Sequence, residues 1–234
     1  MFRKELKVLD CTIRDGGLIN NYHFTDDFVK AVYRAACDSG VDIIELGKKL
    51  AVSEEYPRDK FGKWNFCDDD DLKMVIDSHE CENRPLVAVM FDIGRVDVDN
   101  LKPREQSPFD MARVACYVPD IDKGLDLVKR SKDMGYETTI NGIGRGAGNC
   151  NLELLLNFLK NPKFDVEPIY KAIQDVFVPL RQEIEWGFND IYGISGHLNQ
   201  HPRAAMKLRS DKEHCDQCYD FLIESSRLDE GIIS

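Results

Sequence analysis

The sequence predicts an α/β fold built on a parallel β-sheet. Short apolar runs rich in β-branched residues alternate with amphipathic segments of helical period. The runs are almost continuously apolar, which is typical of parallel strands that are buried on both faces. From about residue 165 the alternation gives way to mostly helical sequence. Because 43% of the 234 residues are hydrophobic, the chain can form a substantial core.

Each element has a local reason in the sequence. Thr25 is an N-cap for a helix that Gly40 ends, and the acidic run from Asp68 begins a second helix. Pro119 opens a third, which ends at Gly135. The strands are expected at 7–13, 41–46, 86–91, 111–118 and 137–140, with a turn-rich stretch at 14–24. Further helices are expected at 152–159, 166–186, 196–209 and 212–224.

Five strand–helix units are counted, whereas a closed (β/α)₈ barrel contains eight. The alternating part ends near residue 162, and at the barrel average of roughly 31 residues per unit this is enough chain for five. The pattern therefore leaves two folds open, an open doubly wound sheet and a barrel that lacks some units.

Charge and cysteine content limit the partners. The net charge is −11, from 31 Lys and Arg against 42 Asp and Glu, which argues against nonspecific binding to nucleic acid or anionic membranes. No apolar run approaches the roughly 20 residues of a membrane span, and the N-terminus lacks the apolar region of a secretory signal. The scattered cysteines are typical of reduced core thiols, so we expect a cytoplasmic protein. Cys215 and Cys218 form one Cys-x-x-Cys pair without the second pair that a structural zinc site needs.

The first strand ends in a group of charged residues. Arg14 and Asp15 follow it directly, at the end of a strand where α/β proteins place their chemistry. Asp15 could bind a hard divalent cation, and Arg14 could neutralise an oxyanion. A surface ion pair at a tight turn is the alternative, and spacing alone leaves both open. His23, in the following loop, is a candidate general acid or base, with a solvated histidine as the alternative.

A glycine-rich stretch at 142–148 follows the fifth strand and precedes a helix. A dinucleotide-binding turn has this pattern, but it also requires a strand soon after the helix, and residues 161–165 are too short and broken to form one. Arg145 within the stretch suits a substrate carboxylate or phosphate. Tyr117, near the end of the fourth strand, is a second candidate for contact with a substrate.

Three segments together carry a family resemblance. Asp10-x-Thr12-x-Arg14-Asp15-Gly16 resembles the signature of the DRE-TIM metallolyases. The segment 44–47, with Glu45, resembles the second strand of that superfamily, and 141–149 resembles its glycine-rich segment after a late strand. The run is most similar to the aldolase-type members, such as the 4-hydroxy-2-oxovalerate aldolases, and the similarity covers most of residues 6–162.

The resemblance implies a (β/α)₈ barrel and a divalent metal, Mg²⁺ or Mn²⁺, that binds the enolate of a 2-oxo acid. By position, Asp15 would be a metal ligand, Arg14 the enolate stabiliser, Glu45 an active-site carboxylate and Asn149 an additional ligand. The function expected on this basis is that of a metal-dependent carbon–carbon lyase acting on a small 2-oxo acid.

The chain departs from the family at the remaining metal ligands. The family uses a His-x-His pair on a later strand, and this chain has none; its histidines are His23, His79, His197, His201 and His214. Two family segments that are normally separated by further units appear fused near residue 140, which predicts an internal deletion. We therefore expect an incomplete barrel at 1–162 with a helical C-terminal extension at 163–234 packed on it. The alternative function is that of a catalytically disabled member with a structural or partner-dependent role, and open sheet edges favour self-association.

Overall fold

The computed structural model describes residues 7–98, 101–115, 121–134, 137–140, 160–180 and 190–198, together with isolated positions 153, 156, 157, 182, 205, 208, 219, 220, 222 and 223. The chain divides into two compact units. The first contains Met1–Gly142 and Cys150–Ile184, and the second contains Ile143–Asn149 and Glu185–Ser234.

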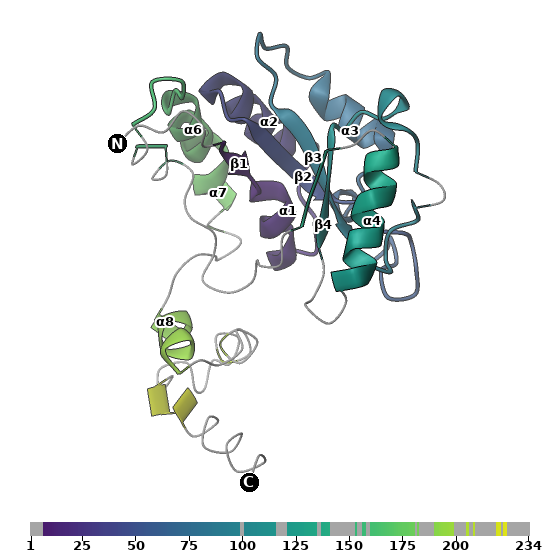
Figure 1. Cartoon of the computed structure of the whole chain (residues 1–234). Helices are drawn as coiled ribbons and strands as arrows, with labels where there is room; N and C mark the ends of the chain where they lie inside the picture. The colour runs from purple at the N-terminus through teal and green to yellow at the C-terminus, as the bar shows by residue number, and fades with distance from the viewer. Residues whose placement is uncertain are drawn as a thin grey trace. The chain divides into compact units, whose positions relative to one another are not determined.

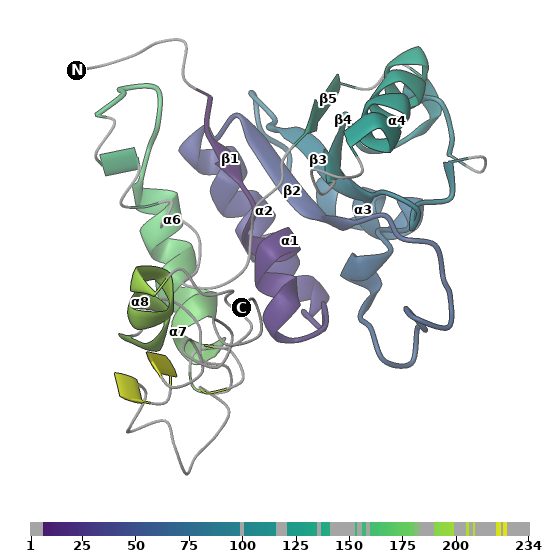
Figure 2. The same ribbon diagram turned by 60° about the horizontal axis from the view of Figure 1, so that its bottom comes forward.

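The first unit is built on a parallel sheet of five strands in the order β1-β2-β3-β4-β5 (Figures 1 and 2). The strands are β1 (Leu9–Asp10), β2 (Ile43–Lys48), β3 (Leu86–Asp92), β4 (Met111–Ala115) and β5 (Glu137–Ile140). Doubly wound sheets contain a point at which the strand order reverses. Here every strand pairs with its neighbour in sequence, as in a barrel, so the structure decides against the doubly wound alternative.

Helices of the first unit cover one face of this sheet. They are α2 (Asp26–Ser39), α3 (Asp69–Ile76) and α4 (Ile121–Asp133). The Thr25 side chain accepts a hydrogen bond from the backbone N–H of Phe28 at 3.3 Å, and Gly40 ends α2 in the left-handed conformation with φ of 73°. Both ends of this helix were predicted, and so was the acidic first turn of α3.

The sheet has two different faces because side chains alternate along each strand. One face joins the main hydrophobic core with the helices; its strand residues include Ile44, Leu46, Val89 and Val114. The opposite face carries a smaller apolar cluster of Ile43, Ala88 and Met111, against which Leu9 and Leu86 pack. By the same alternation Glu45 of β2 and Arg113 of β4 lie on this second face, opposite the helices.

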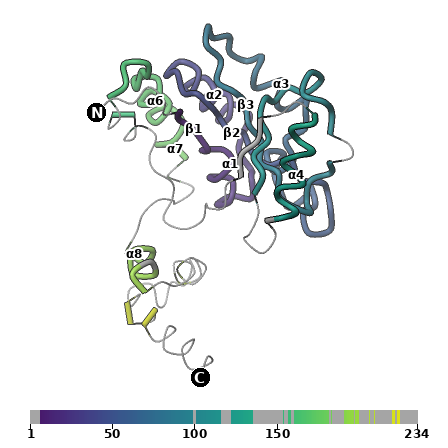
Figure 3. Tube along the Cα trace, in the orientation of Figure 1, coloured from purple at the N-terminus to yellow at the C-terminus, as the bar shows by residue number. Residues whose placement is uncertain are grey.

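A helical run after residue 162 packs on α2. It consists of α6 (Glu167–Ala172), a π-helical turn (Ile173–Phe177) and α7 (Val178–Leu180), as the tube in Figure 3 follows. The rings of Phe28 and Phe177 lie 5.2 Å apart, and the backbone N–H of Asp165 donates to the Ser39 carbonyl at 3.0 Å. In the second unit the structure describes α8 (Asp190–His197). No helix in the described ranges is long and apolar enough to cross a membrane.

The structure corrects several predicted boundaries. The strand predicted at 7–13 has only two residues, and residues 12–16, predicted as strand end and turn, form the helix α1 (Thr12–Gly16) followed by a 3₁₀ turn (Gly17–Ile19). The second strand lies two residues later than predicted. A helix was predicted to begin at residue 196, whereas the observed helix α8 (Asp190–His197) begins six residues earlier and ends at His197. Most of the helices predicted at 152–159, 196–209 and 212–224, and the end of the strand at 116–118, lie outside the described residues.

The cause of the early end of β1 is local. Asp10 accepts hydrogen bonds from the backbone N–H of Thr12 at 3.2 Å and from its hydroxyl at 2.8 Å. An aspartate that bonds two residues ahead turns the chain and begins a helix. The backbone N–H of Asp15 then donates to the Cys11 carbonyl at 2.8 Å, which closes the first helical turn.

Candidate active site

A buried cluster of charged side chains lies on the face of the sheet that is opposite the helices. Glu45 is at 0% exposure in the middle of β2, and Arg113 is at 3% in the middle of β4. Arg113 Nη1 donates to Glu45 Oε2 at 2.5 Å across the intervening strand β3. Ala88 pairs with Glu45 in the register of β2 and β3, and its small side chain leaves room for this contact.

Arg14 joins the cluster from α1. Its Nε donates to Glu45 Oε2 at 2.7 Å, and its Nη1 donates to Asp15 Oδ1. Arg14 is at 4% exposure, so the pair with Asp15 is buried and is not the surface ion pair considered as an alternative. Two guanidinium groups thus share one carboxylate oxygen, with a second carboxylate beside them. This arrangement fixes the orientation of Arg14 at the carboxyl end of β1.

Burial and charge act in opposite directions on these groups. Burial raises the pKa of the Glu45 carboxyl, and the charges of Arg14 and Arg113 oppose that rise without cancelling it. Burial lowers the pKa of Arg14, but Glu45 and Asp15 raise it by more, so it lies above its usual value. Glu45 Oε1 is buried and has no hydrogen-bond partner.

Two further residues at the ends of the neighbouring strands border this cluster. Lys48 ends β2 and its Nζ lies 2.9 Å from Oδ2 of Asp92, which ends β3. The ring of Tyr22 lies under the same ammonium group, with 5.9 Å between Lys48 Nζ and the ring centroid. Carboxyl ends of β1, β2 and β3 therefore all contribute polar groups, as the active-site face of a barrel does.

The remaining predicted site residues are not brought into this cluster by the described contacts. His23 is exposed, and its Nε2 lies 3.2 Å from the Lys60 carbonyl oxygen. Tyr117, Arg145 and Asn149 lie outside the described residues. Sequence reasoning missed Arg113, Lys48 and Tyr22. Arg113 could have been found from the sequence, because it is a charged residue inside an apolar strand. A buried charge requires a partner, so its position indicates a buried charged cluster.

The donor set limits which metal could bind. Among the described residues, no group of three or more His, Cys, Asp or Glu side chains could hold a metal ion. Asp15 is the predicted ligand that the structure does describe. Mg²⁺ is commonly bound through one or two carboxylates plus substrate oxygens and water. The residues described fit an ion of this kind, held jointly with a substrate, and do not fit a metal that the protein holds alone.

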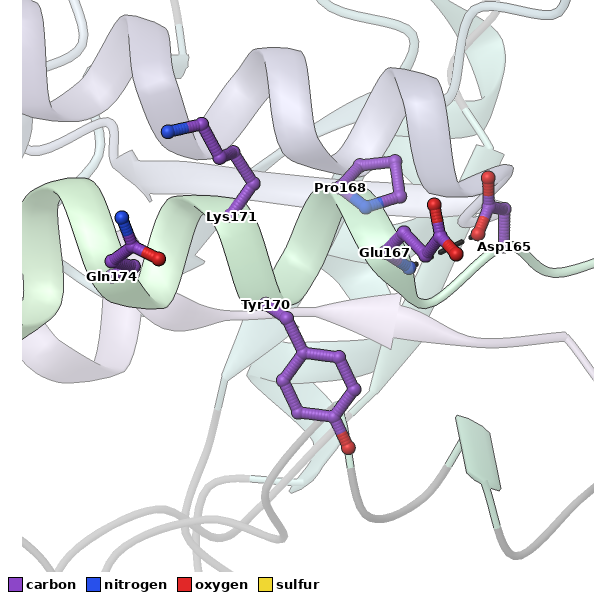
Figure 4. A pocket seen from close by; sticks show the side chains of 6 residues that line it. All are labelled: Asp165, Glu167, Pro168, Tyr170, Lys171 and Gln174. Carbon is purple, nitrogen blue, oxygen red and sulfur yellow. Dashed lines mark hydrogen bonds between the residues drawn. The ribbon is translucent and has the colours of Figure 1, made fainter.

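Two open hollows lie elsewhere in the first unit. One of about 480 Å³ lies beside α6, where the Asp165 side chain accepts a hydrogen bond from the backbone N–H of Glu167 at 3.0 Å (Figure 4). The second, of about 390 Å³, has Arg84 and Arg104 in its lining. Both arginines pair with Asp110, which precedes β4, so this hollow is at the amino ends of the strands. Neither hollow is lined by the charged cluster, and their open, surface-exposed linings do not indicate an active site.

Comparison with known proteins gives a distant match to one group of enzymes. No model of a known protein family matches the chain. It is 25% identical over 138 residues to 4-hydroxy-2-oxovalerate aldolase 6 of Rhodococcus jostii (strain RHA1), which is 58% of this chain and 37% of that protein. It is 27% identical over 134 residues to the 4-hydroxy-2-oxovalerate aldolase of Roseiflexus castenholzii (strain DSM 13941 / HLO8), 56% of this chain and 38% of that protein. The match therefore spans less than two fifths of these curated relatives.

A solved structure supports the fold. The N-terminal domain of a provisionally assigned aldolase from Bacteroides vulgatus superposes with a TM-score of 0.68 at 21% identity, covering 89% of this chain and 98% of that one. The chain is thus distantly similar to 4-hydroxy-2-oxovalerate aldolases and has the α/β fold of an aldolase N-terminal domain.

Proposed function

We propose that this chain is an aldolase-like carbon–carbon lyase that acts on a 2-oxo acid. The observation that carries the proposal is the buried network in which Glu45 and Asp15 hold the Arg14 guanidinium at the carboxyl end of β1. A fixed cation at this edge of a parallel sheet is suited to an anionic substrate. The similarity to proteins named 4-hydroxy-2-oxovalerate aldolase supports the same substrate class.

Arg14 would stabilise the negative charge that develops on the enolate oxygen. Glu45 and Arg113 are positioning residues in this scheme: they bond to Arg14 or to each other and hold the guanidinium in one orientation before substrate arrives. Charge interactions are stronger in a buried site than in water. A guanidinium that needs no reorganisation stabilises an oxyanion at little additional cost.

A divalent cation, Mg²⁺ or Mn²⁺, would act with Arg14 in this proposal. Asp15 would hold it together with Asn149 and oxygens of the substrate. Bound there, the ion would supply Lewis acidity at the substrate carbonyl. Arg145 and Tyr117 would contact the substrate, and His23 would transfer a proton.

The fold in the proposal is a barrel that lacks units, including the one that bears the His-x-His pair in the family. It would comprise residues 1–162, followed by a helical extension at 163–234. The edges left open at β1 and β5 would favour self-association. The location in the proposal is cytoplasmic, which the buried or half-buried thiols of Cys37, Cys67 and Cys81 support.

A second candidate is a catalytically disabled relative with a structural or partner-dependent role. Two observations favour it: no three-ligand metal cluster exists among the described residues, and the sequence has no His-x-His pair.

Exchange of the methyl protons of pyruvate separates the two candidates. In D₂O with Mg²⁺ or Mn²⁺, the enzyme would exchange these protons for deuterium faster than buffer does, as followed by proton NMR. Arg14→Gln should abolish the exchange. Arg58→Gln is the matched control, because Arg58 is half exposed and pairs with Asp68 at 2.8 Å. Exchange no faster than buffer would refute the lyase proposal and favour the disabled relative.

A further inference from the structure

Tyr22 is held in an unusual backbone conformation. Its φ is 65°, in the left-handed region that a bulky residue rarely adopts, and Asn21 before it has φ of 51°. Such a conformation is strained and persists only where the surroundings enforce it. The backbone N–H of Tyr22 donates to the Gly17 carbonyl at 2.8 Å, and that of Gly62 donates to the Asn21 carbonyl at 2.8 Å. The loop is therefore fixed on both sides of the tyrosine.

Two glycines leave the space that Tyr22 occupies. A Cβ on Gly17 would lie 2.2 Å from Cδ1 of the Tyr22 ring, and a Cβ on Gly62 would lie 2.0 Å from its carbonyl oxygen. No real side chain tolerates these distances. The packing thus places the ring in one position next to α1, which carries Arg14 and Asp15.

The hydroxyl group at the end of this ring lacks a partner. Tyr22 is at 2% exposure and its hydroxyl makes no hydrogen bond. An unsatisfied buried polar group destabilises the folded state, and a phenylalanine at this position would avoid that loss. A strained, costly tyrosine is typical of a functional position.

The charges around the hydroxyl come from the candidate active site. Burial raises the pKa of Tyr22 well above its usual value; Arg14 opposes the rise, while Asp92 and Asp15 add to it. The phenol is therefore neutral at physiological pH and can donate its proton in a hydrogen bond. The ring itself lies between Gly17, which directly follows α1, and Lys48 Nζ, which is 5.9 Å from the ring centroid and pairs with Asp92 at the end of β3. Tyr22 is thus placed beside the polar groups at the carboxyl ends of the strands.

We propose that Tyr22 is a substrate-binding residue whose hydroxyl donates a hydrogen bond to an anionic oxygen of the 2-oxo acid held beside Arg14. The inference rests on the proposed function. It explains why an unpaired phenol is retained at a buried, strained position. The substrate oxygen is the missing acceptor.

The test compares Tyr22→Phe with wild type by isothermal titration of oxalate, a planar dianion with the geometry of a 2-oxo acid enolate, and of pyruvate. A hydrogen bond to a charged group contributes about 1.5–3 kcal/mol, so the affinity for oxalate should fall by roughly 10- to 150-fold. Because the substitution removes an unsatisfied polar group, the melting temperature of the unliganded variant should equal or exceed that of wild type.

Tyr33→Phe is the matched control. Tyr33 is equally buried, but it lies in α2 near Cys37 and Arg84 rather than near Arg14, so this variant should bind oxalate like wild type. If Tyr22→Phe keeps wild-type affinity for oxalate while Arg14→Gln loses it, the inference is overturned and the proposed function stands. If Tyr22→Phe melts lower without ligand and keeps its affinity, the hydroxyl is structural and the inference is overturned. If wild type binds neither oxalate nor pyruvate at about 10 mM, the proposed function and the inference with it are overturned.

Discussion

Gly16 and Gly17 are adjacent in sequence but should respond in opposite ways to alanine. Both have ordinary helical backbone angles, with φ of −60° and −57°, so neither needs the conformational freedom of glycine. A Cβ on Gly17 would lie 2.2, 2.4 and 2.8 Å from three atoms of the buried Tyr22 ring. A Cβ on Gly16 would meet its nearest neighbour, Phe24 Cζ, at 3.5 Å, which is an ordinary contact.

The size of the difference follows from these distances. Forcing a side chain into a packed core costs about 1–3 kcal/mol, so Gly17→Ala should destabilise the protein by that amount. Gly16→Ala replaces a glycine at the end of α1 and should be neutral or stabilise the protein by up to about 1 kcal/mol. A difference of 1 kcal/mol corresponds to about 2–4 °C in melting temperature at this chain length.

Thermal unfolding followed by circular dichroism measures both variants under identical conditions. We expect Gly17→Ala to melt below wild type and Gly16→Ala at or above it. Oxalate titration of Gly17→Ala would also show weakened binding, since Tyr22 must move. A Gly17→Ala variant as stable as Gly16→Ala would refute the placement of the Tyr22 ring.

Three further predictions concern the charged groups and one helix cap. Glu45→Gln leaves the buried guanidinium groups of Arg14 and Arg113 without their shared carboxylate. The free energy of unfolding, measured with urea, should therefore fall by about 3–5 kcal/mol. A decrease below about 1 kcal/mol would contradict the network. Burial raises the pKa of Asp10 above its usual 3.8, so its contribution to stability is complete below that pH and is lost as pH rises through the folded-state value. Asp10→Asn should therefore gain stability relative to wild type as pH rises above about 4. A difference between the urea midpoints of the two proteins that does not change with pH would contradict this. Thr25→Ala removes the N-cap of α2 and should lower the free energy of unfolding by about 1 kcal/mol in the same urea assay. An unchanged free energy of unfolding would contradict the role of Thr25 as a cap.

Elements whose ends are set by local chemistry could be predicted from the sequence. Thr25 and Gly40 define α2 because a side-chain cap and a left-handed glycine act within a few residues. The run at 7–13 misled the prediction because its β-branched residues favour a strand, whereas the Asp10 side chain turns the chain into α1. Hydrogen bonds from a side chain to the nearby backbone compete with the strand propensity of the residues. The spacing of hydrophobic residues in the sequence does not reveal such bonds.

The sequence pointed to residues of the candidate site only where a sequence motif contains them. Arg14 and Asp15 are adjacent, and the resemblance drew attention to Glu45. Arg113 could not be assigned because its contact with Glu45 depends on the register of three strands. Tyr22 could not be assigned because a left-handed tyrosine has no sequence signature.

In the proposed function, Asp15 and Arg14 together hold a 2-oxo acid and a divalent cation. Electron paramagnetic resonance of Mn²⁺ titrated with the protein and oxalate tests this claim directly. We predict that Mn²⁺ binds at about micromolar concentration in the presence of oxalate and that Asp15→Ala abolishes this binding. Absence of binding up to about millimolar Mn²⁺, or equal binding by Asp15→Ala, would contradict it.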